Sequence, residues 1–389
     1  MRSVTIGLIV VAFFGFPSVI YGSVRLGPVR ITPYVNASGS YTDNVFLTPK
    51  NEKSDFFYSV LPGINVNVKP AGRHRLHLSY DADFSKFDTF SEADYAVHTG
   101  NAALDLKLPR GFEVKLGDKI VRGADLPDFE GDRTKRYIAN SARFDASYPF
   151  WDRFGLAFRY DHDLKDYDRT VDEIDNFTTN TVGGQFRFHI LARTFTFLEY
   201  VYSATDYSRE RRRASNNYSN RINAGITWDI TAKTRGIVRG GYIARDYYGI
   251  EREEESLYAS ADISHEITSR TIFTLRGVRS IFDTSKADRN LRFSTSYISN
   301  QVIAGLRHTY RKFTGSIGGD YIHDRYLRDD LFAGKRRRDD IVRGSVGIDY
   351  QMQRWIKLGV QYRYTNLDSN FNIEDYTENV INFYVGLSL

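Results

Sequence analysis

Residues 75–85 read Arg-Leu-His-Leu-Ser-Tyr-Asp-Ala-Asp-Phe-Ser. Apolar or aromatic side chains occupy every second position, and the positions between them are charged or polar. Alternation with a period of two residues is typical of a β-strand that has one apolar and one polar face. We therefore expect one face of a sheet to carry Leu76, Leu78, Tyr80, Ala82 and Phe84.

The same alternation recurs along the whole chain, clearly so at 154–165, 221–229 and 356–364. We find about eighteen segments of this kind, beginning near residues 29, 56, 73, 94, 111, 137, 153, 176, 193, 218, 234, 255, 270, 296, 312, 340, 354 and 376. Short turns and long loops alternate strictly between them, and the long loops include 42–54, 122–136, 249–254 and 328–339.

The composition excludes several classes of protein. The 389 residues include 27 Phe, 27 Tyr and no Cys, and the mean hydropathy is −0.43. A disordered chain would be poor in aromatic residues. A bundle of membrane helices would need repeated apolar stretches of about 18 residues, and only the N-terminus has one. The absence of Cys excludes a disulfide scaffold and a Cys-ligated zinc site.

The N-terminus has the layout of an export signal. Arg2 precedes an apolar core from Ile6 to Phe16, which is followed by Pro17 and the small residue Gly22. This order of charged, apolar and cleavable regions is typical of a signal peptide. We expect residues 1–22 to be the signal peptide and residues 23–389 to form a single domain.

Strict alternation of short turns and long loops between amphipathic strands is typical of an outer-membrane barrel. A soluble sandwich usually has strands of about 5–6 residues, whereas many here reach a dozen. A propeller would not need a continuous apolar outer face. We therefore predict an all-β fold, a transmembrane antiparallel outer-membrane β-barrel of about 18 strands. In 195–202 and 273–278 the apolar residues change face, which we interpret as a bulge or a strand end that leaves the membrane.

The polar face of such strands would line the lumen. A barrel of 16–18 strands leaves an aqueous channel, and the opposite phase would expose Arg and Lys to lipid at roughly 2–4 kcal/mol each. The mixture of charges suits a hydroxyl-rich solute, and it also fits residues that merely neutralise one another. The predicted pore-lining residues are Arg75, Asp81, Asp83, Lys115, Arg159, Asp161, Asp163, Lys165, Arg187, Arg221, Asp262, Arg307, Asp320, Arg343, Asp349 and Arg363.

Two further patterns have more than one interpretation. Tyrosines recur at similar heights on alternate strands, and we favour a lipid-facing aromatic ring over a ladder of ligand-binding residues. The recurring tyrosines are Tyr80, Tyr160, Tyr200, Tyr242, Tyr321 and Tyr362.

Two basic runs, 209–213 and 335–338, fall in predicted external loops. They could contact anionic lipopolysaccharide or be solvated, and we expect no nucleic-acid binding.

Several features of other barrel proteins are not expected. The first strand starts about ten residues after the expected cleavage site, so there is no room for an N-terminal plug. The longest external loops, about fifteen residues, are short for an in-folded constriction. His74 and His77 face opposite ways on one strand, so we expect no metal site. Asp161 and Asp163 are an ordinary carboxylate pair without a catalytic constellation, so we expect no enzyme and no cofactor.

The chain resembles the β-barrel porin type 2 family. The resemblance rests on Tyr41-Thr42-Asp43-Asn44-Val45-Phe46, followed by Ser54-Asp55, Pro62-Gly63, Gly72-Arg73 and Tyr80. Members of this family are outer-membrane barrels found with bacterial exopolysaccharide systems. The resemblance therefore implies a barrel that moves a polysaccharide across the outer membrane.

We accordingly expect a monomeric outer-membrane pore for export of an exopolysaccharide. Its expected partners are outer-membrane lipid, lipopolysaccharide, the polysaccharide substrate and periplasmic export proteins. The alternative is a general or oligosaccharide-selective diffusion porin, which the same mixed-charge lumen would serve.

Overall fold

The computed structural model describes residues 23–70, 73–125, 135–169, 175–191, 193–208, 215–231, 233–248, 252–283, 296–329, 334–372 and 374–388. The predicted signal peptide lies outside these residues. No helix in the described ranges is both long enough and apolar enough to cross a membrane. The strands are β1 (Val24–Leu26), β2 (Val29–Thr42), β3 (Asp55–Val68), β4 (Arg75–Phe87), β5 (Tyr95–Lys107), β6 (Glu113–Asp125), β7 (Lys135–Phe150), β8 (Phe154–Tyr167), β9 (Phe177–Leu191), β10 (Thr194–Tyr207), β11 (Asn217–Thr231), β12 (Thr234–Tyr247), β13 (Glu253–Thr268), β14 (Thr271–Asp283), β15 (Ser296–Tyr310), β16 (Phe313–Asp329), β17 (Arg336–Gln353), β18 (Ile356–Ser369) and β19 (Tyr376–Ser388).

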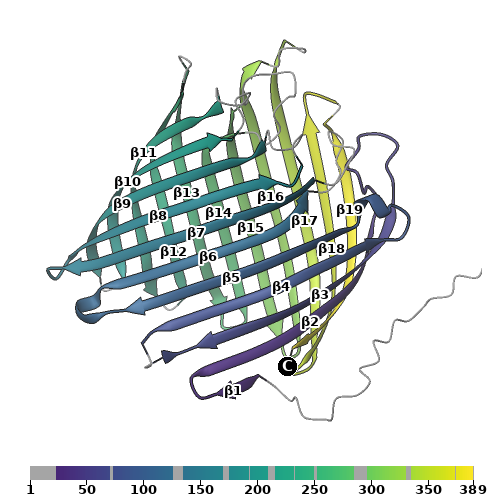
Figure 1. Ribbon diagram of the computed structural model, residues 1–389, viewed down its shortest axis with the longest axis horizontal. Coiled ribbons are helices and arrows are strands. Elements are labelled where there is room, and N and C mark those ends of the chain that lie inside the picture. The colour runs from purple at the N-terminus through teal and green to yellow at the C-terminus, as the bar shows by residue number, and fades with distance from the viewer. Residues whose placement is uncertain are drawn as a thin grey trace, which may run out of the picture.

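Each strand from β2 to β19 pairs with its neighbour in antiparallel fashion, and β19 pairs with β2. The eighteen strands therefore form a closed barrel, as Figure 1 shows. The predicted fold class is confirmed. The three residues of β1 pair only with the beginning of β2 and add a short hairpin there.

The register of the strands gives each residue a face, because directly paired residues point to the same side and successive residues to opposite sides. On β3 and β4 one face exposes large apolar side chains, such as Tyr58 at 58% and Phe84 at 45%. The other face carries Asp81 and Asp83, of which Asp83 lines a hollow that six strands share. The apolar face is the outside of the barrel, and the polar face is the inside.

The changes of face in 195–202 and 273–278 do not come from bulges inside these segments. The β10–β11 ladder runs without interruption from Phe195 to Thr205, and the β14–β15 ladder does so along all of β14. The predicted irregularity is present only at the edge of the first segment, where the β9–β10 ladder shifts its register between Thr194 and Phe195. The apolar residues change face because Phe195 and Phe197 are inner-face residues, placed under the guanidinium groups of Arg187 and Arg239.

Two predicted loops are shorter than expected. β13 begins at Glu253, and β16 and β17 extend to Asp329 and from Arg336. Charged residues at these strand ends suggest loops from sequence, but here they form cross-strand ion pairs, such as Arg336 Nε to Asp329 Oδ1 at 3.2 Å. The basic run 335–338 therefore lies largely on a strand, and the run 209–213 lies outside the described residues.

The motif that carries the family resemblance closes the barrel. Asp43 accepts hydrogen bonds from the backbone N and the Nδ2 of Asn379 at 2.7 and 2.6 Å. Asn44, which is fully buried, donates from Nδ2 to the carbonyl oxygens of Thr48 and Thr377, both at 2.9 Å. These bonds join the end of β2 to the beginning of β19, the seam between the first and last barrel strands.

We predict that Asn44→Ala weakens this seam. The substitution leaves two carbonyl oxygens and one backbone N–H without their side-chain partner, and an unsatisfied buried polar group costs about 1–3 kcal/mol. Urea unfolding in lipid vesicles, followed by tryptophan fluorescence, should show a loss of this size. Lys50→Ala, in the same loop but exposed, should change stability little. Equal stability of wild type and Asn44→Ala would contradict the assignment.

Candidate functional site

All sixteen predicted pore-lining positions lie on the inner face by register. On β8 the inner residues Arg159, Asp161 and Asp163 pair with Asp145, Arg143 and Ser141 of β7. On the opposite wall Asp320 pairs with Arg343. Other members of the set follow from the same ladders of β4, β6, β9, β11, β13, β15, β17 and β18.

Many charges on the inner face form ion pairs along the wall, between neighbouring strands. Asp161 accepts hydrogen bonds from the Nε atoms of Arg143 and Arg159, both at 2.6 Å. Arg343 Nε donates to Asp320 at 2.7 Å. Further described pairs of this kind are Arg276–Asp262, Lys357–Asp349 and Arg363–Glu378. At these positions the wall is therefore highly charged but locally balanced.

A second polar cluster surrounds Glu199 on β10. Its carboxylate accepts from Gln185 at 2.7 Å and from Asn223 at 2.9 Å, and Arg239 lies 3.6 Å away. Arg187 donates from Nε to Gln185 at 2.9 Å. Glu199, Gln185, Arg187 and Arg239 line one hollow in the wall, where they present hydrogen-bonding groups of both signs to the lumen.

The end of the β14–β15 hairpin leaves the wall. The β13–β14 ladder stops at Ala259 and Arg279, although β13 continues to Glu253. The β15–β16 ladder continues to the Tyr297–Tyr326 pair. The hairpin end is thus released on its β13 side and held on its β16 side.

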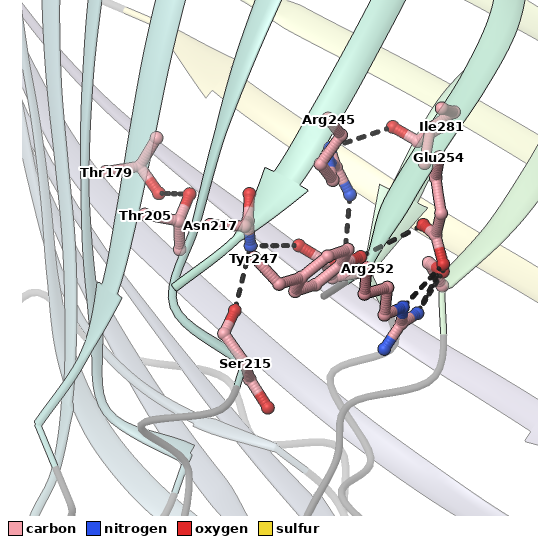
Figure 2. A network of polar contacts seen from close by, with 11 residues as sticks. Thr179, Thr205, Ser215, Asn217, Arg245, Tyr247, Arg252, Glu254 and Ile281 are labelled. Atoms are coloured by element: carbon pink, nitrogen blue, oxygen red, sulfur yellow. Dashed lines mark hydrogen bonds and ion pairs between the residues drawn. The ribbon is translucent and has the colours of Figure 1, made fainter. Parts of the chain in front are cut away.

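Contacts of Asp283, the last residue of β14, show where this end goes. Its carboxylate accepts from Arg245 Nη1 at 2.8 Å and from the Tyr247 hydroxyl at 3.2 Å, both on β12. It also accepts from Asn217 Nδ2 on β11 at 3.1 Å. Figure 2 shows three of these partners, Asn217, Arg245 and Tyr247, close to one another. Three strand spacings would separate β14 from β11 by about 14 Å within a wall, which is beyond the reach of Asp and Asn side chains. The hairpin end therefore swings inward and lies over the inner face of β11 to β13.

The inward swing buries a small apolar cluster inside the barrel. Ile281 and Ile298 have the parity of outward residues, yet they are 3% and 4% exposed and pack with Ile243 and Tyr258. The hairpin end turns inward while it stays paired with β16. The side chains that would otherwise point outward, among them Ile281 and Ile298, therefore lie against the inner wall. The prediction that the external loops are too short for an in-folded constriction concerns loops, whereas the inward-turned part described here consists of the ends of β14 and β15.

Beside this cluster lies a buried ion pair. Glu254 of β13 binds Arg252, and both side chains are at most 7% exposed. Ser296, the first residue of β15, donates to Glu254 at 2.5 Å and accepts from Arg252 at 2.7 Å. A buried pair of this kind is stable only when both charges are hydrogen bonded, so Ser296 ties the end of β15 to β13.

No group of three or more His, Asp or Glu side chains within the described ranges is arranged to hold a metal ion. His77 instead bonds to Asn67 at 3.0 Å, and His74 accepts from the backbone N of Lys107 at 3.3 Å.

A closed antiparallel barrel with an apolar outer face and a charged inner face is the architecture of an outer-membrane porin. The chain belongs to the family described as "Putative beta-barrel porin 2", whose model matches residues 22–389. It is a protein of the bacterial outer membrane. No curated protein sequence matches the chain.

Solved porin structures share the fold at low sequence identity. OpdK of Pseudomonas aeruginosa is 12% identical with a TM-score of 0.50, and the match covers 92% of this chain and 99% of OpdK. OccK2 (OpdF) of the same species is 10% identical with a TM-score of 0.51, covering 95% and 99%. A BenF-like porin of Pseudomonas fluorescens Pf-5 is 10% identical with a TM-score of 0.50, covering 92% and 99%.

We predict that Asp283→Ala releases the hairpin end and raises single-channel conductance in planar bilayers. The Arg245 and Asp283 side chains are 11% and 14% exposed, and breaking a buried pair costs roughly 3–5 kcal/mol. Asp262→Asn is the matched control, because Arg276 and Asp262 are 68% and 54% exposed and such pairs contribute about 0–1 kcal/mol. A folded Asp283→Ala barrel with wild-type conductance would show that the hairpin end does not restrict the lumen.

Proposed function

We propose that the protein is a passive diffusion channel for small hydrophilic solutes. The observation that carries the proposal is the inward-turned end of β14 and β15, fixed over the inner face by Asp283 and Ser296. It narrows a lumen whose wall is charged but locally balanced. A narrowed, polar and permanently hydrogen-bonded passage suits solutes that are small enough to pass beside it.

This proposal replaces exopolysaccharide export, which the family resemblance implied. One solved barrel that shares the fold is titled a BenF-like porin, and one OpdK structure contains vanillate, a small aromatic carboxylate. Nothing in the comparisons points to a polymer as cargo. The alternative named from the sequence, a diffusion porin, therefore becomes the main proposal.

The inner wall supports a preference for solutes with both polar and aromatic character. Arg187 and Arg239 stack on the rings of Phe195 and Phe197, at 5.0 and 5.6 Å from their centroids. Guanidinium groups bind carboxylates through charge-assisted hydrogen bonds, and the rings offer apolar contact. We propose no catalytic role for Asp161, because two arginines already bind its carboxylate.

Uptake into liposomes tests the proposal. Purified protein should admit small sugars and vanillate into vesicles without any partner protein, and it should exclude dextran. Heat-unfolded protein is the control. A barrel that admits no small solute, while deletion of its gene stops secretion of a surface polysaccharide, would restore the export hypothesis.

Ion selectivity tests the balance of the wall. With Asp320 and Arg343 paired at 2.7 Å, the wild-type reversal potential in a KCl gradient should lie near zero. Asp320→Asn leaves a free guanidinium and should shift selectivity toward anions, whereas Arg343→Gln should shift it toward cations. Shifts of the same sign in both variants would contradict a lumen lined by this pair.

A further inference from the structure

A repeated polar position encircles the outer face near the extracellular strand ends. Eight of the strands that run from the long loops toward the short turns carry one such outward residue, two to five residues after the strand begins. Successive members lie about 40 residues apart in the chain. We name this set the polar belt, and its members are His98, Asn140, Asn180, Asn220, Glu255, Asn300, Asp340 and Asn379.

The recurring tyrosines face outward and bind this belt. Tyr321 pairs in register with Val342, and its hydroxyl donates to Asp340, two residues nearer the extracellular end, at 2.5 Å. The other five tyrosines repeat this geometry with His98, Asn180, Asn220, Glu255 and Asn379. A polar group beside hydrocarbon is costly unless hydrogen bonded, and Tyr favours membrane interfaces. The belt thus marks the level at which hydrocarbon gives way to headgroups.

One pair of strands carries two cations directly above the belt. Arg325 of β16 and Arg338 of β17 are paired in register, one step beyond His323 and Asp340 toward the outside. Like charges directly opposite each other destabilise a sheet. Neither guanidinium has a hydrogen-bond or ion-pair partner in the part of the chain that the structure describes, and both side chains are exposed.

Among the described residues, no neighbouring carboxylate forms an ion pair with these arginines. Asp340, on the step below, already accepts from Tyr321 and from His323 at 2.5 and 2.9 Å. Asp368 pairs with Asp340 on that lower step. Arg336, farther out on β17, is bound to Asp329. The side chain that would flank Arg325 on β15 is Ile298, which is buried in the inward-turned cluster.

Equivalent positions on other hairpins lack this arrangement. The step above the belt holds Glu253 and Asp246 on β13 and β12, and Thr377 and Asn366 on β19 and β18. Arg122 on β6 occupies this step alone, and its guanidinium binds Asp168 at 3.0 Å. Among these hairpins, β16–β17 is therefore the one where two cations lie directly opposite each other at headgroup height without an ion pair.

We propose that Arg325 and Arg338 bind a phosphate group of lipopolysaccharide in the outer leaflet. The phosphates of its lipid A lie at the boundary between hydrocarbon and headgroups, where the belt places this pair. Guanidinium groups bind phosphate through forked, charge-assisted hydrogen bonds. One bridging phosphate would remove the repulsion between the two arginines. The site lies on the outer face, so it is independent of the proposed channel function.

Binding of purified lipid A tests the proposal. The refolded, lipid-free full chain in detergent is titrated with diphosphorylated lipid A, and bound lipid is counted by native mass spectrometry. Arg325→Gln/Arg338→Gln should weaken binding at least about tenfold, and Arg122→Gln should leave it unchanged. Heat-modifiable electrophoretic migration verifies that each variant is folded, and the double Arg→Lys variant covers the case in which the Gln variant does not fold.

Three results would overturn the proposal. The first is equal lipid A binding by wild type and the folded double variant. The second is an equal loss in Arg122→Gln, which would indicate general surface charge. The third is equally tight binding of phosphatidylglycerol or inorganic phosphate, which would show that the pair does not select phosphorylated glycolipid.

Discussion

The structure depends on the need to pair every backbone N–H and C=O group that faces hydrocarbon, where no water is available. A sheet meets this need only when its first and last strands join, as β2 and β19 do here. The seam is reinforced where the ladder ends, since Asp43 and Asn44 replace backbone partners with side-chain bonds to the β19 strand. The motif that suggests the family thus has a physical role in closure.

Closure of the barrel also determines which side chains face lipid and which face the lumen. Because the wall is one sheet thick, each strand must present apolar residues to lipid and can present charged ones to the lumen. Charges pair along the wall, as in Arg343–Asp320, and leave the lumen balanced. The end of β14 and β15 departs from the sheet by turning into the lumen, where Asp283 bonds to β11 and β12.

The sequence predicts the features that follow from the alternation of side chains between the two faces of each strand. Alternation places Asp161 and Asp163 inside and Leu156 and Phe158 outside, and the eighteen-strand count follows from the turns. The sequence does not predict the inward hairpin. Ile281 and Asp283 stand at alternate positions with the outward Phe273 and Leu275, so the pattern assigns all four to the outer face. The departure becomes visible in the early end of the β13–β14 ladder and in the contacts of Asp283 with β11 and β12. The tyrosine repeat is visible in the sequence, but its partners on the next strand emerge only from the register.

The central claim is a water-filled, polar lumen inside a closed barrel, and the chain has no Cys, so single cysteines can test it. Cysteines at positions 156 to 163 of β8 should be probed in lipid vesicles with a water-soluble maleimide and with a lipid-phase quencher of an attached fluorophore. Positions 157, 159, 161 and 163 should react with the maleimide, and 156, 158, 160 and 162 should respond to the quencher. Loss of this alternation, or aqueous protection of positions 159 and 161, would contradict the account.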